Sequence, residues 1–340
     1  MRCWSGASSA PADVFFRKLA FRLAIGTKWN LAENSSTRGI HNFAILTACS
    51  TILLLVAGAL VTSNDAADSV PDWPLAYGRI IPPLIGGIRY EFAHRVVAGL
   101  VAVLTVVLAI WISFSKLRGS ARRWAWIAFA LVVAQALLGA ARVLLGHAAF
   151  VATIHATVAQ IFFITVISLT MFTSGWWQRD LPQLDDTGSP KLRSLSVWLT
   201  AVILVQLVLG AGFRHGALGI LPHLIGFLVV TCMVIWTARI ANKRFGNVGD
   251  IRRWVVILHS TYGTQVILGF LAYWAVSQAR LAAQPVLLYT VIEVAHVVMG
   301  ALVLASGALL ALTCNRLIRS ADAVSVESRT TRSQAQGSRA

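Results

Sequence analysis

The chain has 340 residues, of which 57% are apolar and only 12% charged, and its mean hydropathy is +0.72. A soluble domain of this size does not carry so much apolar sequence, and the apolar residues come in continuous runs rather than at amphipathic spacing. The net charge of +16 is not gathered into a basic and aromatic surface, which argues against nucleic-acid binding. The composition therefore predicts a protein embedded in a lipid bilayer.

Apolar segments of about 20 residues, the length that crosses a bilayer as a helix, recur along the chain. In chain order, the eight segments cover residues 42–62, 90–114, 122–142, 151–173, 194–213, 220–239, 253–275 and 286–314. We expect an all-α polytopic membrane protein with eight transmembrane helices. A basic arm (1–41) precedes them, a polar linker (175–193) divides them, and a polar tail (316–340) without apolar periodicity is expected to be disordered.

Basic residues are concentrated in the arm, in alternate loops and in the tail. By the positive-inside rule, both termini face the cytoplasm and the protein lies in the inner (plasma) membrane. The arm is also basic and contains serine but few acids, a composition shared with mitochondrial transit segments, so the mitochondrial inner membrane is the less favoured alternative.

Four histidines lie in the first turns of the second, fourth, sixth and eighth segments, which all run from the outer to the inner face. Intramembrane histidines are costly and usually functional, and paired histidines on facing helices are a common way to hold haem iron. We therefore predict two metal sites near the outer leaflet, His94 with His155 and His223 with His296. The alternative for any one of them is a hydrogen bond to a neighbouring helix.

A short repeat supports this pairing. QALLG (135–139), QLVLG (206–210) and QVILG (265–269) occur in the third, fifth and seventh segments, and the first segment carries the looser LLVAG (54–58). The repeat and the histidine placement predict two pseudo-symmetric four-helix bundles, residues 42–174 and 194–315.

Two of the histidines belong to E-x-x-H motifs, Glu91 with His94 and Glu293 with His296. Residues three apart lie on one helical face, so each carboxylate can orient its imidazole or act on a bound substrate. Di-iron carboxylate bundles also use E-x-x-H but need glutamates on the partner helices, and residues 151–173 and 220–239 contain none. Haem is therefore the favoured ligand.

Further polar residues flank the predicted sites. Arg95 follows His94 inside an apolar segment, and we favour pairing with haem propionates over snorkelling to lipid headgroups. For Arg214 and His215 in the fifth loop, contact with a haem and a position at the membrane surface both remain open. The proline-rich first outer loop, with Asp72, is either a structured lid or a plain connection.

The chain resembles the COX15/CtaA family of haem A synthases over roughly residues 40–315. The resemblance rests on VTSNDAADSVPDWPLAYG (61–78), EFAHRVVAG (91–99), HATVAQ (155–160), PHLIG (222–226) and EVAHVVMGA (293–301). One departure is that residues 62–90 contain no cysteine, whereas some members carry a cysteine pair in this loop.

The resemblance implies an oxidoreductase that oxidises the C8 methyl group of haem O to the formyl group of haem A through a hydroxylated intermediate. It implies that His94 and His155 hold the substrate haem, that His223 and His296 hold a haem b for electron transfer, and that Glu91 is functional. We expect Glu91 to be catalytic and Glu293 only orienting. Haem O synthase and the assembly of cytochrome oxidase are the implied partners, and a homo-oligomer is left open.

Two other classes of function share the predicted haem sites. A di-haem b electron-transfer protein would keep both histidine pairs but give Glu91 no chemical task. A haem transporter or chaperone would bind haem reversibly and release it unchanged.

Overall fold

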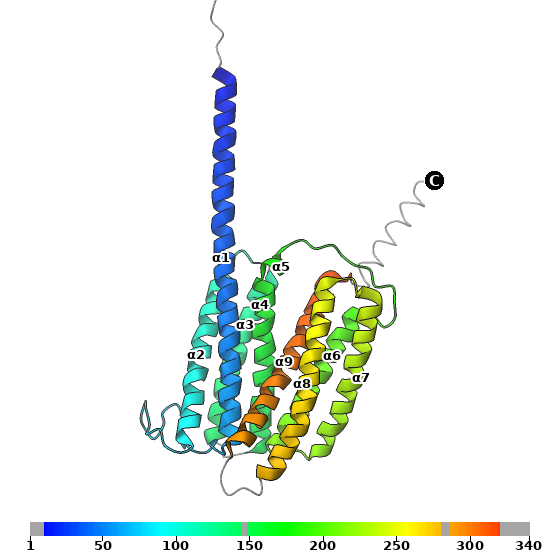
Figure 1. Ribbon diagram of the computed structural model, residues 1–340. Helices are drawn as coiled ribbons and strands as arrows, with labels where there is room; N and C mark the ends of the chain where they lie inside the picture. Colours follow the sequence, from blue (N-terminus) through cyan, green and yellow to red (C-terminus); the bar gives the residue numbers. More distant parts are fainter. Residues whose placement is uncertain (1–9, 118, 145–147, 280–285, 320–340) are drawn as a thin grey trace, which may run out of the picture.

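The computed structural model describes residues 10–117, 119–144, 148–279 and 286–319 of the chain. Within these residues the fold is helical, with two isolated β-bridges and no strand (Figure 1). The helices are α1 (Ala10–Ser63), α2 (Ile88–Ser113), α3 (Gly119–Leu144), α4 (Ala149–Thr173), α5 (Gly175–Gln178), α6 (Leu192–Arg214), α7 (Ile220–Phe245), α8 (Gly249–Ala279) and α9 (Leu287–Leu317). Eight of them, all but the single turn α5, are long and apolar enough to cross a membrane, which confirms the predicted fold class.

The structure describes most of the predicted arm and almost none of the predicted tail. Helix α1 is continuous from Ala10, although its apolar span covers only Thr37–Ser63, so from residue 10 onward the predicted arm is a helical extension of the first span. The tail prediction lies almost wholly outside the described residues, which end at 319.

The spans form two rings of four helices. In the first ring, α1 contacts α2, α2 contacts α3, α3 contacts α4, and α4 returns to α1; helices α6, α7, α8 and α9 close the second ring in the same order. The rings meet through the pairs α1–α9, α4–α9 and α4–α6. Exchanging the two halves leaves this set of contacts unchanged, which is compatible with the predicted pseudo-symmetric bundles.

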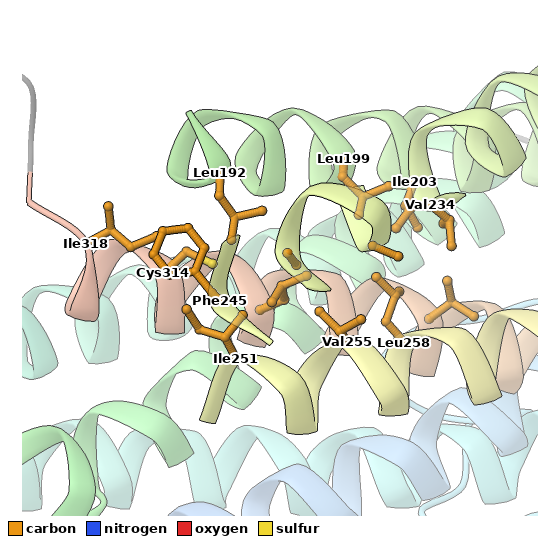
Figure 2. Close-up of a cluster of buried hydrophobic side chains, with 14 of the residues drawn as sticks. Leu192, Leu199, Ile203, Val234, Phe245, Ile251, Val255, Leu258, Cys314 and Ile318 are labelled. Atoms are coloured by element: carbon orange, nitrogen blue, oxygen red, sulfur yellow. The ribbon is translucent and has the colours of Figure 1, made fainter. Parts of the chain in front are cut away.

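Each ring has its own apolar core, and both cores occupy the same end of the molecule. Figure 2 shows the core of the second ring, where Leu192, Phe245 and Ile251 pack against the end of α9. On each histidine-bearing helix the first member of these two ring cores comes seven positions after the histidine: Val101 after His94, Phe162 after His155, Val230 after His223 and Val303 after His296. Two helical turns thus separate every histidine from the core of its own ring.

The seam between the rings is packed by small and aromatic side chains. Phe163 on α4 is fully buried against Ala301 and Ala305 on α9. Small residues on α9 let the helices approach closely, and close van der Waals packing is what holds helices together in a bilayer.

Candidate haem sites at the histidine end

The four predicted ligands lie at one end of the molecule. Each falls within the first ten residues of its helix, and α2, α4, α7 and α9 all start on the side opposite the N-terminal extension of α1 (Figure 1). We call this side the histidine end. His94 and His155 interact electrostatically with each other within the first ring, as do His223 and His296 within the second. Each predicted pair therefore lies within one ring, and its ligation of a metal stays a prediction.

Each of the four imidazoles packs against a glycine of the preceding helix. An added Cβ would lie close to the imidazole Cε1 atom in each case: 3.1 Å for Gly58 and His94, 3.7 Å for Gly139 and His155, 2.9 Å for Gly210 and His223, and 3.3 Å for Gly269 and His296. These are the last residues of the four repeat units. The repeat is visible in the sequence, but its purpose is not, because the sequence does not show which helix faces each histidine.

The first position of the repeat also contacts the histidines. The Nε2 atom of Gln206 donates to the His223 carbonyl oxygen at 2.9 Å and lies 3.1 Å from His223 Nδ1. Gln265 Nε2 lies 3.4 Å from His296 Nε2. These two amides therefore reach imidazole nitrogens in the second ring.

The first ring is arranged differently. Gln135 Nε2 donates to the main-chain carbonyl of His155 at 2.9 Å, and the ring nitrogen Nδ1 of His155 is buried without a hydrogen-bond partner. In α1 the repeat begins with Leu54, so the polar group on α1 that bears on the His94 ring is a main-chain carbonyl.

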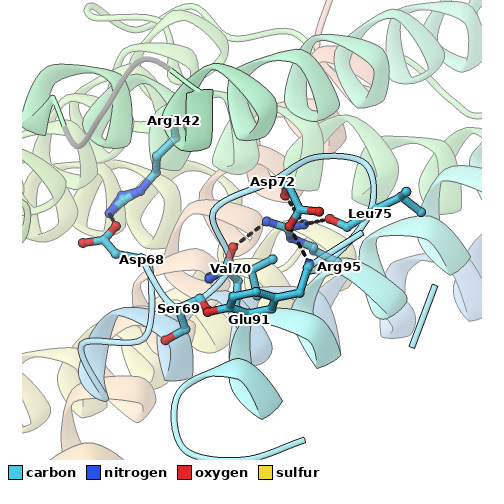
Figure 3. Close-up of polar contacts among 9 residues, drawn as sticks. Asp68, Ser69, Val70, Asp72, Leu75, Glu91, Arg95 and Arg142 are labelled. Carbon is cyan, nitrogen blue, oxygen red and sulfur yellow. Dashed lines mark hydrogen bonds and ion pairs between the residues drawn. The ribbon is translucent and has the colours of Figure 1, made fainter. Parts of the chain in front are cut away.

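Glu91 and Arg95 form a partly buried pair that holds the loop between α1 and α2 against α2 (Figure 3). Glu91 Oε1 accepts from Arg95 Nη2 at 2.7 Å, and its Oε2 accepts from the Val70 amide at 3.0 Å. Arg95 Nη1 donates to the carbonyl oxygens of Asp72 and Leu75 at 2.8 and 3.0 Å. Arg95 is thus engaged within the chain, and its contact with propionates stays a prediction.

The same loop is ordered by Asp72, which favours the lid over a plain connection. Its two carboxylate oxygens accept from the amides of Tyr77 and Gly78 at 2.6 and 2.7 Å. The bond from Gly78, opposed by partial burial, lowers the pKa of Asp72 from its usual value. At the far side, Arg142 Nη2 at the end of α3 lies 3.9 Å from Asp68 Oδ1 (Figure 3). The loop therefore reaches from α2 toward α3 across the end of the first ring.

Glu293 has a different set of partners. Its Oε2 accepts from Ser63 Oγ at 2.8 Å and lies 3.8 Å from Arg214 Nη1. Arg214 Nη2 donates to Ser63 Oγ at 2.6 Å and to the Ala59 carbonyl at 3.1 Å. Glu293 is therefore engaged at the junction of α1, α6 and α9 rather than hydrogen-bonded to His296, and this junction links the two rings.

His215 caps the C-terminus of α6 beside this junction. Burial, followed by the positive charges of Arg214 and Arg142, lowers its pKa to about 4. The imidazole is consequently neutral near pH 7, and it interacts electrostatically with His155 of the other ring. Sequence reasoning left this residue open because its neighbours come from helices distant in the chain.

The donor set fits haem better than a bare ion. Among the described residues, no group of three or more His, Cys, Asp or Glu side chains could hold a metal ion. Haem iron needs only two imidazole ligands, and the glycines let each imidazole lie close to the neighbouring helix. The Nδ1 atoms of His94, His155 and His296 are buried without a hydrogen-bond partner.

Fold and site together define a polytopic membrane protein built from two four-helix rings, each presenting a histidine pair at the same end. Residues 88–317 match the COX15-CtaA family, described as cytochrome oxidase assembly protein. The match covers well over half of the chain, so the chain belongs to this family and the predicted resemblance is confirmed.

Individual relatives are proteins named Heme A synthase. That of Shouchella clausii is 33% identical over 138 residues, covering 39% of this chain and 45% of the relative. That of Lysinibacillus sphaericus is 36% identical over 134 residues (38% and 43%), and that of Exiguobacterium sibiricum 27% over 183 residues (52% and 60%). The aligned part of the chain spans about half the length of these relatives.

Proposed function

We propose that the chain is a haem A synthase, an oxidoreductase that converts the C8 methyl group of haem O into a formyl group through a hydroxylated intermediate. The observation that carries this proposal is the fourfold seating of imidazoles on helix glycines in a member of this family. The names of the relatives support the same activity.

In this proposal the two rings have different tasks. His94 and His155 would hold the substrate haem O, and His223 and His296 would hold a haem b. When bound, haem b would supply one-electron transfer to or from the substrate site. The bacterial relatives support a plasma-membrane location, with haem O synthase as the supplier of substrate and cytochrome oxidase assembly as the consumer of product.

Glu91 is the proposed catalytic residue. It lies one helical turn before His94, and Arg95 and the Val70 amide hold its carboxylate in place. Oxidation of a ring methyl develops positive charge at the carbon, and at about 5 Å with an effective dielectric near 20 a carboxylate stabilises that charge by about 3 kcal/mol, or roughly a hundredfold in rate. The same carboxylate can accept a proton from the attacking water.

Extraction of the bound pigments tests the proposal. The chain is expressed with a haem O synthase, purified, and its haems are separated by chromatography. We expect haem A or its hydroxylated precursor alongside haem b. Haem b alone would favour the di-haem electron-transfer alternative, and unchanged haem O would favour a transporter or chaperone.

A further inference from the structure

The loop between α1 and α2 (64–87) changes character along its length. Its first part (64–72) carries three aspartates, whereas its second part (73–87) carries no acid and a single basic residue, Arg79. The second part also leaves large apolar side chains exposed: Ile80 by 82%, Ile81 by 69%, Leu84 by 55% and Ile85 by 68%. A cluster of exposed apolar side chains marks a contact surface rather than ordinary water-facing chain.

The apolar part of the loop packs against the side of α2. Ile80 and Ile81 line one cavity with Phe92 and Val96 of α2, and the loop extends sideways past α2 at the histidine end (Figure 1). A row of exposed apolar side chains at helical spacing continues along α2 from this point: Val96, Leu100, Val103 and Val107. In a membrane-crossing helix such a row faces lipid, so the loop and the lipid-facing side of α2 form one continuous apolar surface.

The position of this contact along α2 corresponds to membrane depth. Helix α2 has 26 residues and is about 39 Å long, whereas the hydrocarbon core of a bilayer is about 30 Å thick. A centred helix therefore extends about 5 Å beyond the core at each end. Val96 lies eight residues after Ile88, the first residue of α2, which places it about 12 Å along the helix and about 7 Å inside the core. The loop residues that share a cavity with Val96 are consequently beside lipid.

The main chain of the loop is suited to such a place. Backbone groups exposed to lipid need partners within the protein, because water is absent there. Ala76 and Arg79 exchange main-chain hydrogen bonds at 2.9 and 3.1 Å, and Asp72 accepts from the amides of Tyr77 and Gly78. The four consecutive amides 76–79 are therefore all bonded within the loop. Four further positions have no amide hydrogen to satisfy, because they are prolines: Pro71, Pro74, Pro82 and Pro83.

We propose that residues 73–85 form an interfacial membrane anchor. The isoleucines and the leucine of this segment insert beside α2 into the lipid leaflet at the histidine end, with the exposed Trp73 and Tyr77 at headgroup level. Lipid is the occupant of this surface, because the surface continues the lipid-facing row of α2 and carries aromatic and basic side chains without an acid. Arg95, which holds two loop carbonyls and Glu91, joins the anchor to the candidate haem site.

Depth measurements by spin labelling test the anchor in the full chain. The four native cysteines are replaced by alanine, and a nitroxide is attached in an Ile81→Cys variant reconstituted in nanodiscs of phosphatidylcholine and phosphatidylglycerol. Val103→Cys supplies the lipid-facing reference, and Asp68→Cys, whose native side chain is half exposed, supplies the aqueous one. We expect the ratio of oxygen to nickel-chelate accessibility at position 81 to exceed that at position 68 several-fold and to approach that at position 103.

A second measurement leaves the cysteines in place. A benzophenone amino acid is incorporated in place of Ile81 and irradiated in the same nanodiscs, and mass spectrometry should then find a phospholipid adduct, as it should for Val103. A nickel accessibility at position 81 equal to that at position 68 would overturn the anchor. So would a label shielded from both reagents or a protein adduct, since either would show a partner protein or a second copy on this surface. A chain that takes up no haem yet forms the lipid adduct would refute the proposed function and leave the anchor standing.

Discussion

The two rings place the same histidine pattern in different polar surroundings. In the first ring, the Glu91–Arg95 pair and a long loop anchored by Asp72 lie at the histidine end. In the second ring, glutamines approach the imidazoles, and Glu293 joins Arg214 and Ser63 at the seam with the first ring. The contrast shows how a few polar residues can specialise two halves that share one packing plan.

The largest expected effect separates the two glutamates. Glu91→Gln should reduce haem A formation about a hundredfold, because the carboxylate charge is lost beside the proposed substrate. Glu293→Gln should reduce it far less, because Glu293 lies at the seam. For both variants, the assay measures the haem A formed per bound haem b in cells that also express a haem O synthase. Equal losses would remove the proposed asymmetry between the two E-x-x-H motifs.

The next largest effect is expected on haem content when the glycines that contact the imidazoles are substituted. At Gly210 an added Cβ would lie 2.9 Å from the His223 ring, whereas at Gly139 it would lie 3.7 Å from the His155 ring, an ordinary contact distance. Gly210→Ala should therefore displace its imidazole and lower haem b content about tenfold, while Gly139→Ala should lower haem content little. Pyridine haemochrome assays measure the content, and a thermal melt checks that both variants fold. If Gly139→Ala proved the more damaging, the seating geometry would be wrong.

A smaller effect is expected on the pH dependence of stability, where His215 and Asp72 should act in different pH ranges. The pKa of His215 falls from 6.5 to about 4 in the folded protein, so the unfolded chain binds more protons below pH 6.5 and stability should fall as the pH drops from 6.5 toward 4. The pKa of Asp72 is lowered instead, so its contribution should persist until the pH falls below about 3.8. The melting temperature between pH 7 and 5 should fall less steeply in His215→Gln, whereas Asp72→Asn should keep the wild-type slope. An unchanged slope in His215→Gln would contradict this assignment.

The smallest effect is expected at the edge of the first ring. Arg142 and Asp68 are 3.9 Å apart, and the Asp68 side chain is half exposed. Partly exposed ion pairs typically contribute about 0.2 to 1 kcal/mol, so Arg142→Gln should leave the melting temperature and haem content near wild type. Arg95→Gln is the informative partner experiment, because Arg95 holds two loop carbonyls and Glu91, and its loss should expose the loop to proteolysis.

Much of the fold was predictable because length and hydropathy are read directly from the chain. The eight spans follow from apolar runs, and the shared end of the four histidines follows from alternating helix direction. The sequence also revealed the spacing between Gln206 and Gly210. It did not reveal that both residues contact His223, because this depends on which helix packs against that face of α6.

The partners of the charged residues were the least predictable part. Arg214 reaches Ser63 and Glu293, which come from the first and last spans. Glu91 binds a loop amide 21 residues before it in the chain. Such contacts depend on how the rings dock and on how the loop folds back, and neither leaves a periodic signal in the sequence.

The seven-residue offset between each histidine and the first core residue has a practical consequence for engineering. Substitutions that improve the interior around Leu199 or Leu108 act on the half of the molecule remote from the imidazoles. A thermostabilised variant could therefore be evolved by changing that half alone, and the histidine end would keep its wild-type sequence.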